Sequence, residues 1–299
     1  MQRRSVLALI TIGALARNTF AASSASQASN GVHVTQAPVR TDIAAVNGLQ
    51  LYHEIHGSGG RPLVVLHGGV AASESFGANL PALAASRQVI AVHLQGHGRT
   101  RDIERPLRFE TMADDVAALA AHLGLKKIDV LGYSLGGGVA QQLAIRHPAL
   151  VERLVVVSQP FKRAAWYPEV LGAFEAMAAR APQIAQNIAG SPMGALYPDV
   201  KWEALVRKIG ELESHDYDWS TDVAKIRART LLVFADADAM HPEHMVDFYK
   251  LLGGGQHDAG MDGARRPAAQ WAVLPGTTHY DLLATDAVAK AAVPFLDAA

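Results

Sequence analysis

The chain has 299 residues, of which 49% are hydrophobic and 18% charged, a globular composition with room for one large domain or two small ones. Lysine and arginine number 27 and aspartate and glutamate 28, so the net charge of −1 leaves no basic excess to favour a nucleic-acid partner. The sequence has no cysteine, which excludes disulfides, Cys-ligated zinc, iron–sulfur clusters, a thiol nucleophile and a lipid anchor on cysteine.

Residues 1–25 are predicted to be an export signal. Arg3 and Arg4 precede an apolar run over residues 6–16, which has the length of a signal-peptide core and is shorter than the roughly 20 residues that cross a bilayer. The paired arginines also resemble a twin-arginine signal, and small residues suited to cleavage follow at 21–25. We therefore expect a periplasmic or secreted protein with no membrane span in its mature chain. A buried N-terminal helix is the alternative.

Residues 26–40 are rich in Ser, Ala, Gln and Asn and are predicted to be a linker. From residue 41 on, short continuous apolar runs alternate with helical patterns, which predicts an α/β fold with a mostly parallel sheet covered on both faces by helices. Asn47-Gly48 predicts a hairpin of two antiparallel edge strands within 41–55. The predicted strands are 63–66 (LVVL), 89–92 (VIAV), 128–131 (IDVL), 154–157 (LVVV), 231–234 (LLVF) and 271–274 (WAVL), and the predicted helices are 112–123, 135–146, 243–252 and 286–296.

Residues 161–221 interrupt this alternation, because they have helical spacing and no convincing strand. We predict that they form a helical cap, or lid, inserted into a core made of residues 41–160 and 222–299. Among their aromatic residues, Trp166 and Tyr167 are expected to contact an apolar part of a substrate. The alternative is that these rings only pack the interior of the cap.

A serine lies between a predicted strand and a predicted helix, in Gly132-Tyr133-Ser134-Leu135-Gly136. This G-x-S-x-G pattern is typical of a nucleophile elbow, whose turn is so tight that side chains two residues before and after the serine would clash. The pattern alone is a weak signal, but the strand before it and the helix after it make it a strong one. Ser134 is therefore the predicted nucleophile, and the Leu135 N–H at the helix start can stabilise an oxyanion.

His67-Gly68-Gly69 follows the predicted strand 63–66. Together with the elbow, this turn resembles the α/β-hydrolase family, and the resemblance extends over residues 41–299. The resemblance implies that Gly69, or alternatively Val70, provides the second oxyanion N–H, and that His67 shapes the turn without reacting. A serine nucleophile argues against the relatives that use aspartate, the haloalkane dehalogenases and epoxide hydrolases.

The base and acid are expected late in the chain, because the family's order is serine, acid, histidine. Thirteen histidines compete for the role of base. The resemblance assigns it to His279, because residues 276–279 match the family's G-x-x-H turn after the last strand. The acid of the family's G-D-x-D pattern corresponds to Asp238, although Ala235 replaces the usual glycine. Asp236 is expected to cap the loop or the next helix.

For two other groups of polar residues, a structural role is favoured over a functional one. Asp236, Asp238, His241 and His244 could together ligate a metal, but His241 opens a predicted helix and Asp238 already has a role, so no metal is expected. The segment 93–100 follows a strand where the family has D-x-x-G-x-G-x-S. Here His93 and Thr100 replace the Asp and the Ser, and we expect a structural loop held by its glycines.

These observations favour a cofactor-free serine hydrolase that cleaves an ester, lactone or related acyl bond of a small molecule. Perhydrolysis of the haloperoxidase type and C–C bond hydrolysis are the alternatives that use the same triad. A non-catalytic binding protein with this fold is the alternative of another class, because a fold alone implies no function. The sequence leaves the identity of the substrate and the oligomeric state open.

Overall fold

The computed structural model describes residues 40–298, so the predicted signal and the predicted linker up to residue 39 lie outside the described residues. Eight strands form one sheet in the order β1-β2-β4-β3-β5-β6-β7-β8. Strand β2 is antiparallel to β1 and β4, and the remaining neighbours are parallel. The strands are β1 (Arg40–Val46), β2 (Leu49–His56), β3 (Leu63–Leu66), β4 (Val89–Val92), β5 (Ile128–Tyr133), β6 (Val151–Val157), β7 (Arg229–Ala237) and β8 (Gln270–Thr278).

The six apolar runs all lie within strands of this sheet, so the predicted α/β fold is confirmed. In β3 to β7 this continuous apolar character follows from burial on both faces, whereas Trp271 and Val273 of the edge strand β8 are exposed. In β3, Leu63 and Val65 belong to the core on one face, and Val64 and Leu66 belong to the core on the other. The alternating side chains of β3 to β7 therefore connect two hydrophobic layers.

The predicted hairpin at the edge of the sheet is also confirmed. Val46 of β1 pairs with Leu49 of β2, which leaves a two-residue turn. Asn47 has φ +48° and Gly48 has φ +81°. A type I′ turn needs a positive φ at both central residues, and Asn-Gly is the pair that adopts it most readily.

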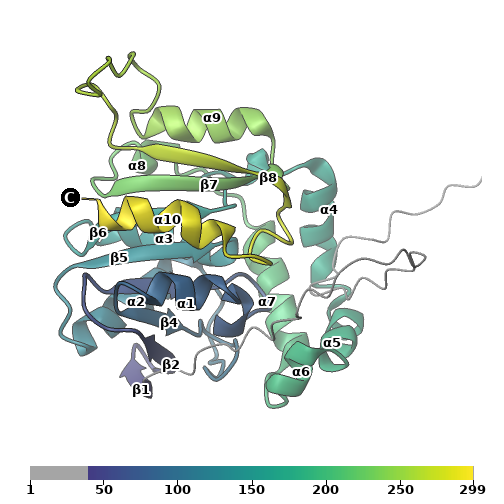
Figure 1. Cartoon of the computed structure of the whole chain (residues 1–299). Helices are drawn as coiled ribbons and strands as arrows, with labels where there is room; N and C mark the ends of the chain where they lie inside the picture. The colour runs from purple at the N-terminus through teal and green to yellow at the C-terminus, as the bar shows by residue number, and fades with distance from the viewer. Residues whose placement is uncertain (1–39, 299) are drawn as a thin grey trace, which may run out of the picture.

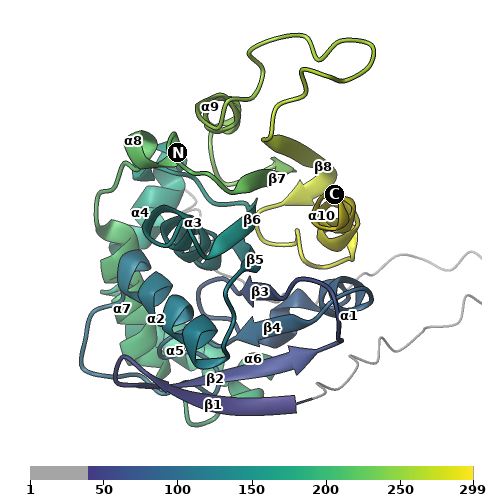
Figure 2. The ribbon, with the colours of Figure 1, turned by 90° about the vertical axis from the view of Figure 1, so that its left-hand side faces the viewer.

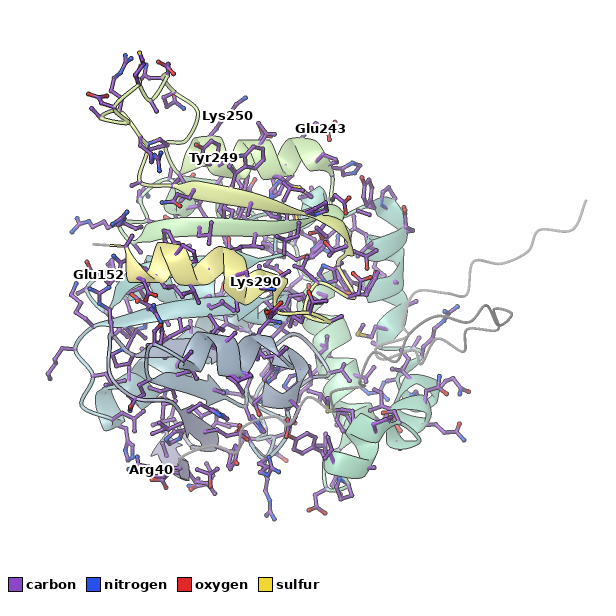
Figure 3. All side chains as sticks on the ribbon, viewed as in Figure 1. Arg40, Glu152, Glu243, Tyr249, Lys250 and Lys290 are labelled. Carbon is purple, nitrogen blue, oxygen red and sulfur yellow. The ribbon has the colours of Figure 1, made fainter. Side chains whose placement is uncertain are left out.

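Helices cover both faces of the sheet, as Figure 2 shows: α1 and α10 lie on one face, and α2, α3 and α9 lie on the other. Side chains fill the space between the layers, and Lys250 of α9 and Lys290 of α10 are exposed (Figure 3). No helix within residues 40–298 is long and apolar enough to cross a membrane. The helices of these layers are α1 (Asn79–Ala84), α2 (Phe109–His122), α3 (Leu135–Arg146), α9 (Pro242–Leu251) and α10 (Ala287–Asp297), and a 3₁₀ turn, η1 (Ser73–Phe76), precedes α1.

The segment between β6 and β7 is helical, in agreement with the spacing of residues 161–221. Helices α4 to α7 gather beside one end of the sheet (Figure 1), while α8 lies against α3. The segment holds the 3₁₀ turn η2 (Arg163–Ala165) and the helices α4 (Pro168–Met177), α5 (Ala181–Ala189), α6 (Pro192–Leu196), α7 (Trp202–Ser214) and α8 (Ser220–Val223).

Candidate active site

Ser134 lies in the sharp turn between β5 and α3, with φ +51° and ψ −125°. This is a strained conformation for a residue with a side chain. The turn also brings Gly132 and Gly136 against the backbone. A Cβ on Gly132 would lie 2.1 Å from the Gly136 oxygen, and one on Gly136 would lie 2.2 Å from the Leu66 oxygen. The two glycines are therefore required by close approach, and the turn holds the Ser134 side chain at the carboxyl edge of the sheet.

His279 follows β8 and faces the serine. Its Nε2 lies 3.1 Å from Ser134 Oγ, which is hydrogen-bond distance for proton transfer between a nucleophile and a base. The Tyr133 hydroxyl donates a hydrogen bond to the His279 backbone oxygen. The indole of Trp166 packs edge-on against the imidazole, with ring centres 5.5 Å apart. The ring of His279 is thus held by its neighbours as well as by the serine.

Two carboxylates fix the loop that carries His279. Asp236 Oδ2 accepts from the Gly276 N–H at 2.9 Å, and its Oδ1 accepts from the Thr277 N–H at 3.0 Å. Asp281 Oδ1 accepts from the Thr278 N–H at 2.6 Å. These backbone donors hold the pKa of Asp236 below its usual value. The structure therefore places Asp236 in the loop-capping position expected for it.

Asp238 lies on the far side of the imidazole. Its Oδ1 is 3.3 Å from His279 Nδ1, and the carboxylate accepts from the backbone N–H groups of Ala239 at 2.7 Å and Ala235 at 3.0 Å. Burial acts to raise the pKa of Asp238, but the interaction with His279 and the hydrogen bonds to the carboxylate outweigh it and lower the pKa. The structure thus brings all three predicted triad residues together, with the acid ionised at neutral pH.

Ser158 was not predicted as a site residue, although it is the first residue after β6. It is fully buried, has φ +52°, and its Oγ lies 2.7 Å from Asp238 Oδ1 and 2.7 Å from His279 Nδ1. The hydroxyl can donate to the carboxylate while its oxygen accepts the Nδ1 proton. The available signal was its place at the carboxyl end of a strand next to the one that precedes Asp238.

The proposed oxyanion donors lie beside Ser134. Leu135 is the first residue of α3, so its N–H has no partner within the helix. Gly69 and Val70 lie in the loop after β3, and all three residues line the same cavity as Ser134. Val70 has φ +56°, a further strained residue in this turn.

Two histidines shape the loops around the oxyanion turn. The Leu94 N–H donates to His67 Nε2 at 3.2 Å, so His67 Nδ1 carries the proton and donates to the Gly68 oxygen at 2.7 Å. Burial lowers the pKa of His67 well below its usual value, with His97 and His93 adding to the effect, so the ring is neutral. His93 Nδ1 accepts from the Arg99 N–H at 2.9 Å, which holds the following loop as a structural element.

A cavity of about 210 Å³ opens at Ser134 and His279. Trp166 lines it, whereas Tyr167 is not among the lining residues because its ring packs on His241, with centres 4.3 Å apart. Apart from the reacting groups, the lining is mostly apolar and comes largely from α4, α5 and α7, with Val170, Ala173, Phe174, Met177, Ile184, Val206 and Ile209.

The four residues weighed as metal ligands have separate partners. Asp236 and Asp238 bind the backbone groups and the histidine described above. His244 stacks on Phe161, with ring centres 4.1 Å apart, and accepts from the Phe161 N–H. His241 lies at the N-terminus of α9. Within residues 40–298, no three His, Cys, Asp or Glu side chains gather in a way that could hold a metal ion.

Known proteins share the fold of this chain. Residues 61–199 match the family described as the alpha/beta hydrolase fold. An alpha/beta hydrolase enzyme from a Medee basin deep-sea metagenome library is similar over 86% of this chain and 98% of its own, with a TM-score of 0.70 and 16% identity. The enol-lactonase from Burkholderia xenovorans LB400 is similar over 86% of this chain and 100% of its own, with a TM-score of 0.66 and 22% identity. The described residues therefore have the α/β-hydrolase fold, and residues 61–199 match the model of that family.

Particular relatives match over shorter stretches. A soluble epoxide hydrolase from Corynebacterium sp. (strain C12) is 41% identical over 117 residues, which are 38% of this chain and 40% of that protein. The dihydrolipoyllysine-residue acetyltransferase component of the acetoin cleaving system of Pseudomonas putida is 32% identical over 165 residues, 54% of this chain and 45% of that protein. The chain thus spans less than half the length of these curated relatives.

Proposed function

We propose that this protein is a serine hydrolase that cleaves a carboxylic ester, lactone or related acyl bond of a small molecule. One observation carries the proposal: a continuous hydrogen-bonded chain runs from Ser134 through His279 to Asp238 and opens on a cavity. A nucleophile, a base and an orienting acid in this relation are the components of acyl transfer. Their strained and buried setting is costly, which favours a catalytic role over a structural one.

In the acylation step, Ser134 Oγ attacks the carbonyl carbon and His279 Nε2 takes the hydroxyl proton. The Leu135 and Gly69 N–H groups stabilise the oxyanion that forms. The tetrahedral intermediate collapses when His279 returns the proton to the leaving oxygen, which leaves an ester between Ser134 and the acyl group. Asp238 keeps the Nδ1 proton in place and stabilises the imidazolium.

Water completes the reaction. His279 Nε2 removes a proton from a water molecule that attacks the acyl carbon, and the second tetrahedral intermediate collapses when Ser134 recovers its proton. The carboxylic acid product then leaves. Each step uses only groups of this chain and water, so the proposal needs no cofactor.

We propose that the segment between β6 and β7 acts as a cap that shapes the substrate site. Trp166 and the lining residues of α4, α5 and α7 support this, because they form an apolar surface facing Ser134. Ligand pockets usually measure about 300–1,000 Å³. The cavity here measures about 210 Å³ and therefore favours a short substrate group.

A panel of p-nitrophenyl esters of graded chain length, lactones, amides and a diketone tests this function, with the Ser134→Ala variant as the control. We expect short-chain esters or lactones to give the highest kcat/KM. The relatives also include a 2-hydroxymuconate semialdehyde hydrolase and a putative carbamate hydrolase. The diketone and the amides in the panel therefore test cleavage of C–C and C–N bonds. No turnover of any substrate, together with no reaction with a fluorophosphonate, would favour a binding protein instead.

We also propose that the protein is exported, on the basis of Arg3, Arg4 and the apolar run over residues 6–16. The mature protein would then act in the periplasm or outside the cell. The absence of cysteine suits this compartment, because folding does not depend on disulfide formation.

A further inference from the structure

Glu213 on α7 is a buried carboxyl group in the lining of the cavity. Its exposed fraction is 5%, and its Oε2 has no hydrogen-bond partner among residues 40–298. Buried polar atoms in folded proteins nearly always have a partner, and an unpartnered carboxyl is costly. A residue of this kind facing a substrate cavity therefore points to a partner supplied by a ligand.

The nearest cation does not satisfy this carboxyl. Arg163 Nε donates to the backbone oxygen of Glu213 at 2.9 Å, and its Nη2 donates to Glu175 Oε1 at 3.1 Å. Within the described residues, no ion pair joins Arg163 to the Glu213 carboxyl. Burial raises the pKa of Glu213 to about 7, and the charge of Arg163 opposes this only in part. The Arg163 guanidinium moderates the local potential and leaves Glu213 Oε2 without a hydrogen-bond partner among the described residues.

Glu213 also has a defined relation to the reacting groups. A Cβ on Gly69 would lie 3.6 Å from Ile209 Cδ1, so Ile209 lies over the oxyanion turn. Glu213 follows Ile209 by four residues on α7 and therefore lies on the same helix face, one turn further along. Both side chains line the cavity that contains Ser134. If the scissile carbonyl of a substrate lies at the oxyanion turn, a short group extending from it into the cavity reaches the Glu213 carboxyl, about one helical turn away along α7.

We propose that Glu213 anchors the substrate: it accepts a hydrogen bond from a donor, a hydroxyl or an ammonium group, at the far end of the group that fills the cavity. The inference rests on the proposed hydrolase function and narrows it to esters or lactones with a polar terminus. The apolar walls hold the carbon chain, and the single carboxyl selects its end. A substrate whose chain ends in a methyl group would leave the Glu213 carboxyl buried and unpaired. A site built to hydrogen-bond a polar substrate group discriminates strongly against an analogue that lacks this group.

The test compares three short-chain p-nitrophenyl esters of equal length that end in a hydroxyl, an ammonium or a methyl group. We expect the wild type to prefer one of the donor-bearing esters over the methyl ester by about 10- to 100-fold in kcat/KM. In Glu213→Leu this ratio should fall to about one or below. In Glu213→Gln, which keeps an acceptor oxygen but no charge, a hydroxyl preference should survive in part, whereas an ammonium preference should be lost.

Glu175→Gln is the matched control, because it removes the other carboxylate at Arg163 without changing the cavity lining. It should keep the wild-type ratio. The same donor preference in wild type and Glu213→Leu, or a wild type that prefers the methyl ester, would overturn the proposal. These failures differ from failure of the hydrolase function, in which the wild type cleaves none of the three esters and does not react with a fluorophosphonate. Thermal melts establish that each variant is folded.

Discussion

At the scale of single residues, the proton on His279 Nδ1 has two acceptors within reach. Ser158 Oγ lies at 2.7 Å and Asp238 Oδ1 at 3.3 Å. Because Ser158 Oγ is the nearer atom and also contacts the carboxylate, it links the imidazole to the acid. The orientation of the His279 ring therefore depends on a side chain that is not part of the cavity lining.

Removal of the Ser158 hydroxyl should slow turnover by loosening this link. We expect Ser158→Gly to lower kcat about fivefold, the effect of one hydrogen bond of roughly 1 kcal/mol, with little change in KM. Glycine tolerates the φ of +52° at this position, so the variant removes the hydroxyl without adding backbone strain. Steady-state kinetics alongside thermal melts check this, and an unchanged kcat would show that Asp238 alone orients the ring.

The two aspartates after β7 should differ in their effect on catalysis. Asp238→Asn is expected to lower kcat by roughly 10²-fold or more relative to Asp236→Asn, because an amide at the acid position favours the wrong imidazole tautomer. Asp236 binds backbone N–H groups of the loop, and its substitution should mainly loosen that loop. Both variants are assayed with the same ester. If Asp236→Asn proves the more damaging of the two, the acid has been misassigned.

That Ser134, Asp238 and His279 lie together could be predicted from the sequence, because each follows a recognisable strand in the order expected for this fold. Ser158 also follows a strand, but no motif distinguishes it from other serines. Its contact with Asp238 spans 80 residues and arises because β6 and β7 are neighbours in the sheet. Glu213 was missed for a similar reason. A glutamate on an amphipathic helix is expected to face solvent, and only the packing of α7 over the oxyanion turn buries it.

At the scale of the elements, the strands could be predicted more closely than the helical segment. Continuous apolar runs identify buried parallel strands directly, and the helices predicted beside them begin or end within a few residues of α2, α3, α9 and α10. Residues 161–221 carry a helical period, but their division into several short helices is set by contacts among α4, α5 and α7. Local spacing does not contain these contacts.

The protonation state of Glu213 on α7 should make the free energy of unfolding depend on pH. Burial raises its pKa to about 7 in the folded chain, whereas the unfolded chain has the usual value of about 4.3. Between these values the folded state holds the extra proton. The wild type therefore loses stability as pH rises from about 4.3 to about 7 and then levels off.

The Glu213→Gln variant has no carboxyl to titrate at this position. Its free energy of unfolding, relative to that of the wild type, should therefore rise by about 3 kcal/mol as the pH is raised from 4 to 8. Chemical denaturation of the ligand-free proteins at several pH values measures this difference. Parallel stability curves across the range would mean that the carboxyl has a partner in solution and is not an open acceptor. Tyr217 lies near this carboxyl, but burial and Glu213 keep its pKa far above the range tested.

At the scale of the whole molecule, residues 1–39 precede the described sheet, and the export signal remains a prediction from their sequence. We expect the protein recovered from the periplasm or medium to begin within residues 22–26, and replacement of Arg3 and Arg4 by lysine to retain the precursor if the signal is of the twin-arginine type. N-terminal sequencing and intact mass determine this. A mature chain that still begins at Met1 would contradict export.

The whole fold serves to hold a strained serine at the carboxyl edge of the sheet, opposite a histidine from the last strand and beneath α4, α5 and α7. The most direct test of this account is site-mapped labelling with a fluorophosphonate. We predict one label per chain, on Ser134. We also predict that Ser134→Ala keeps the wild-type melting temperature, takes no label and loses on the order of 10⁶ in kcat toward esters. A label on another residue, or near-wild-type esterase activity in a clean Ser134→Ala preparation, would contradict it.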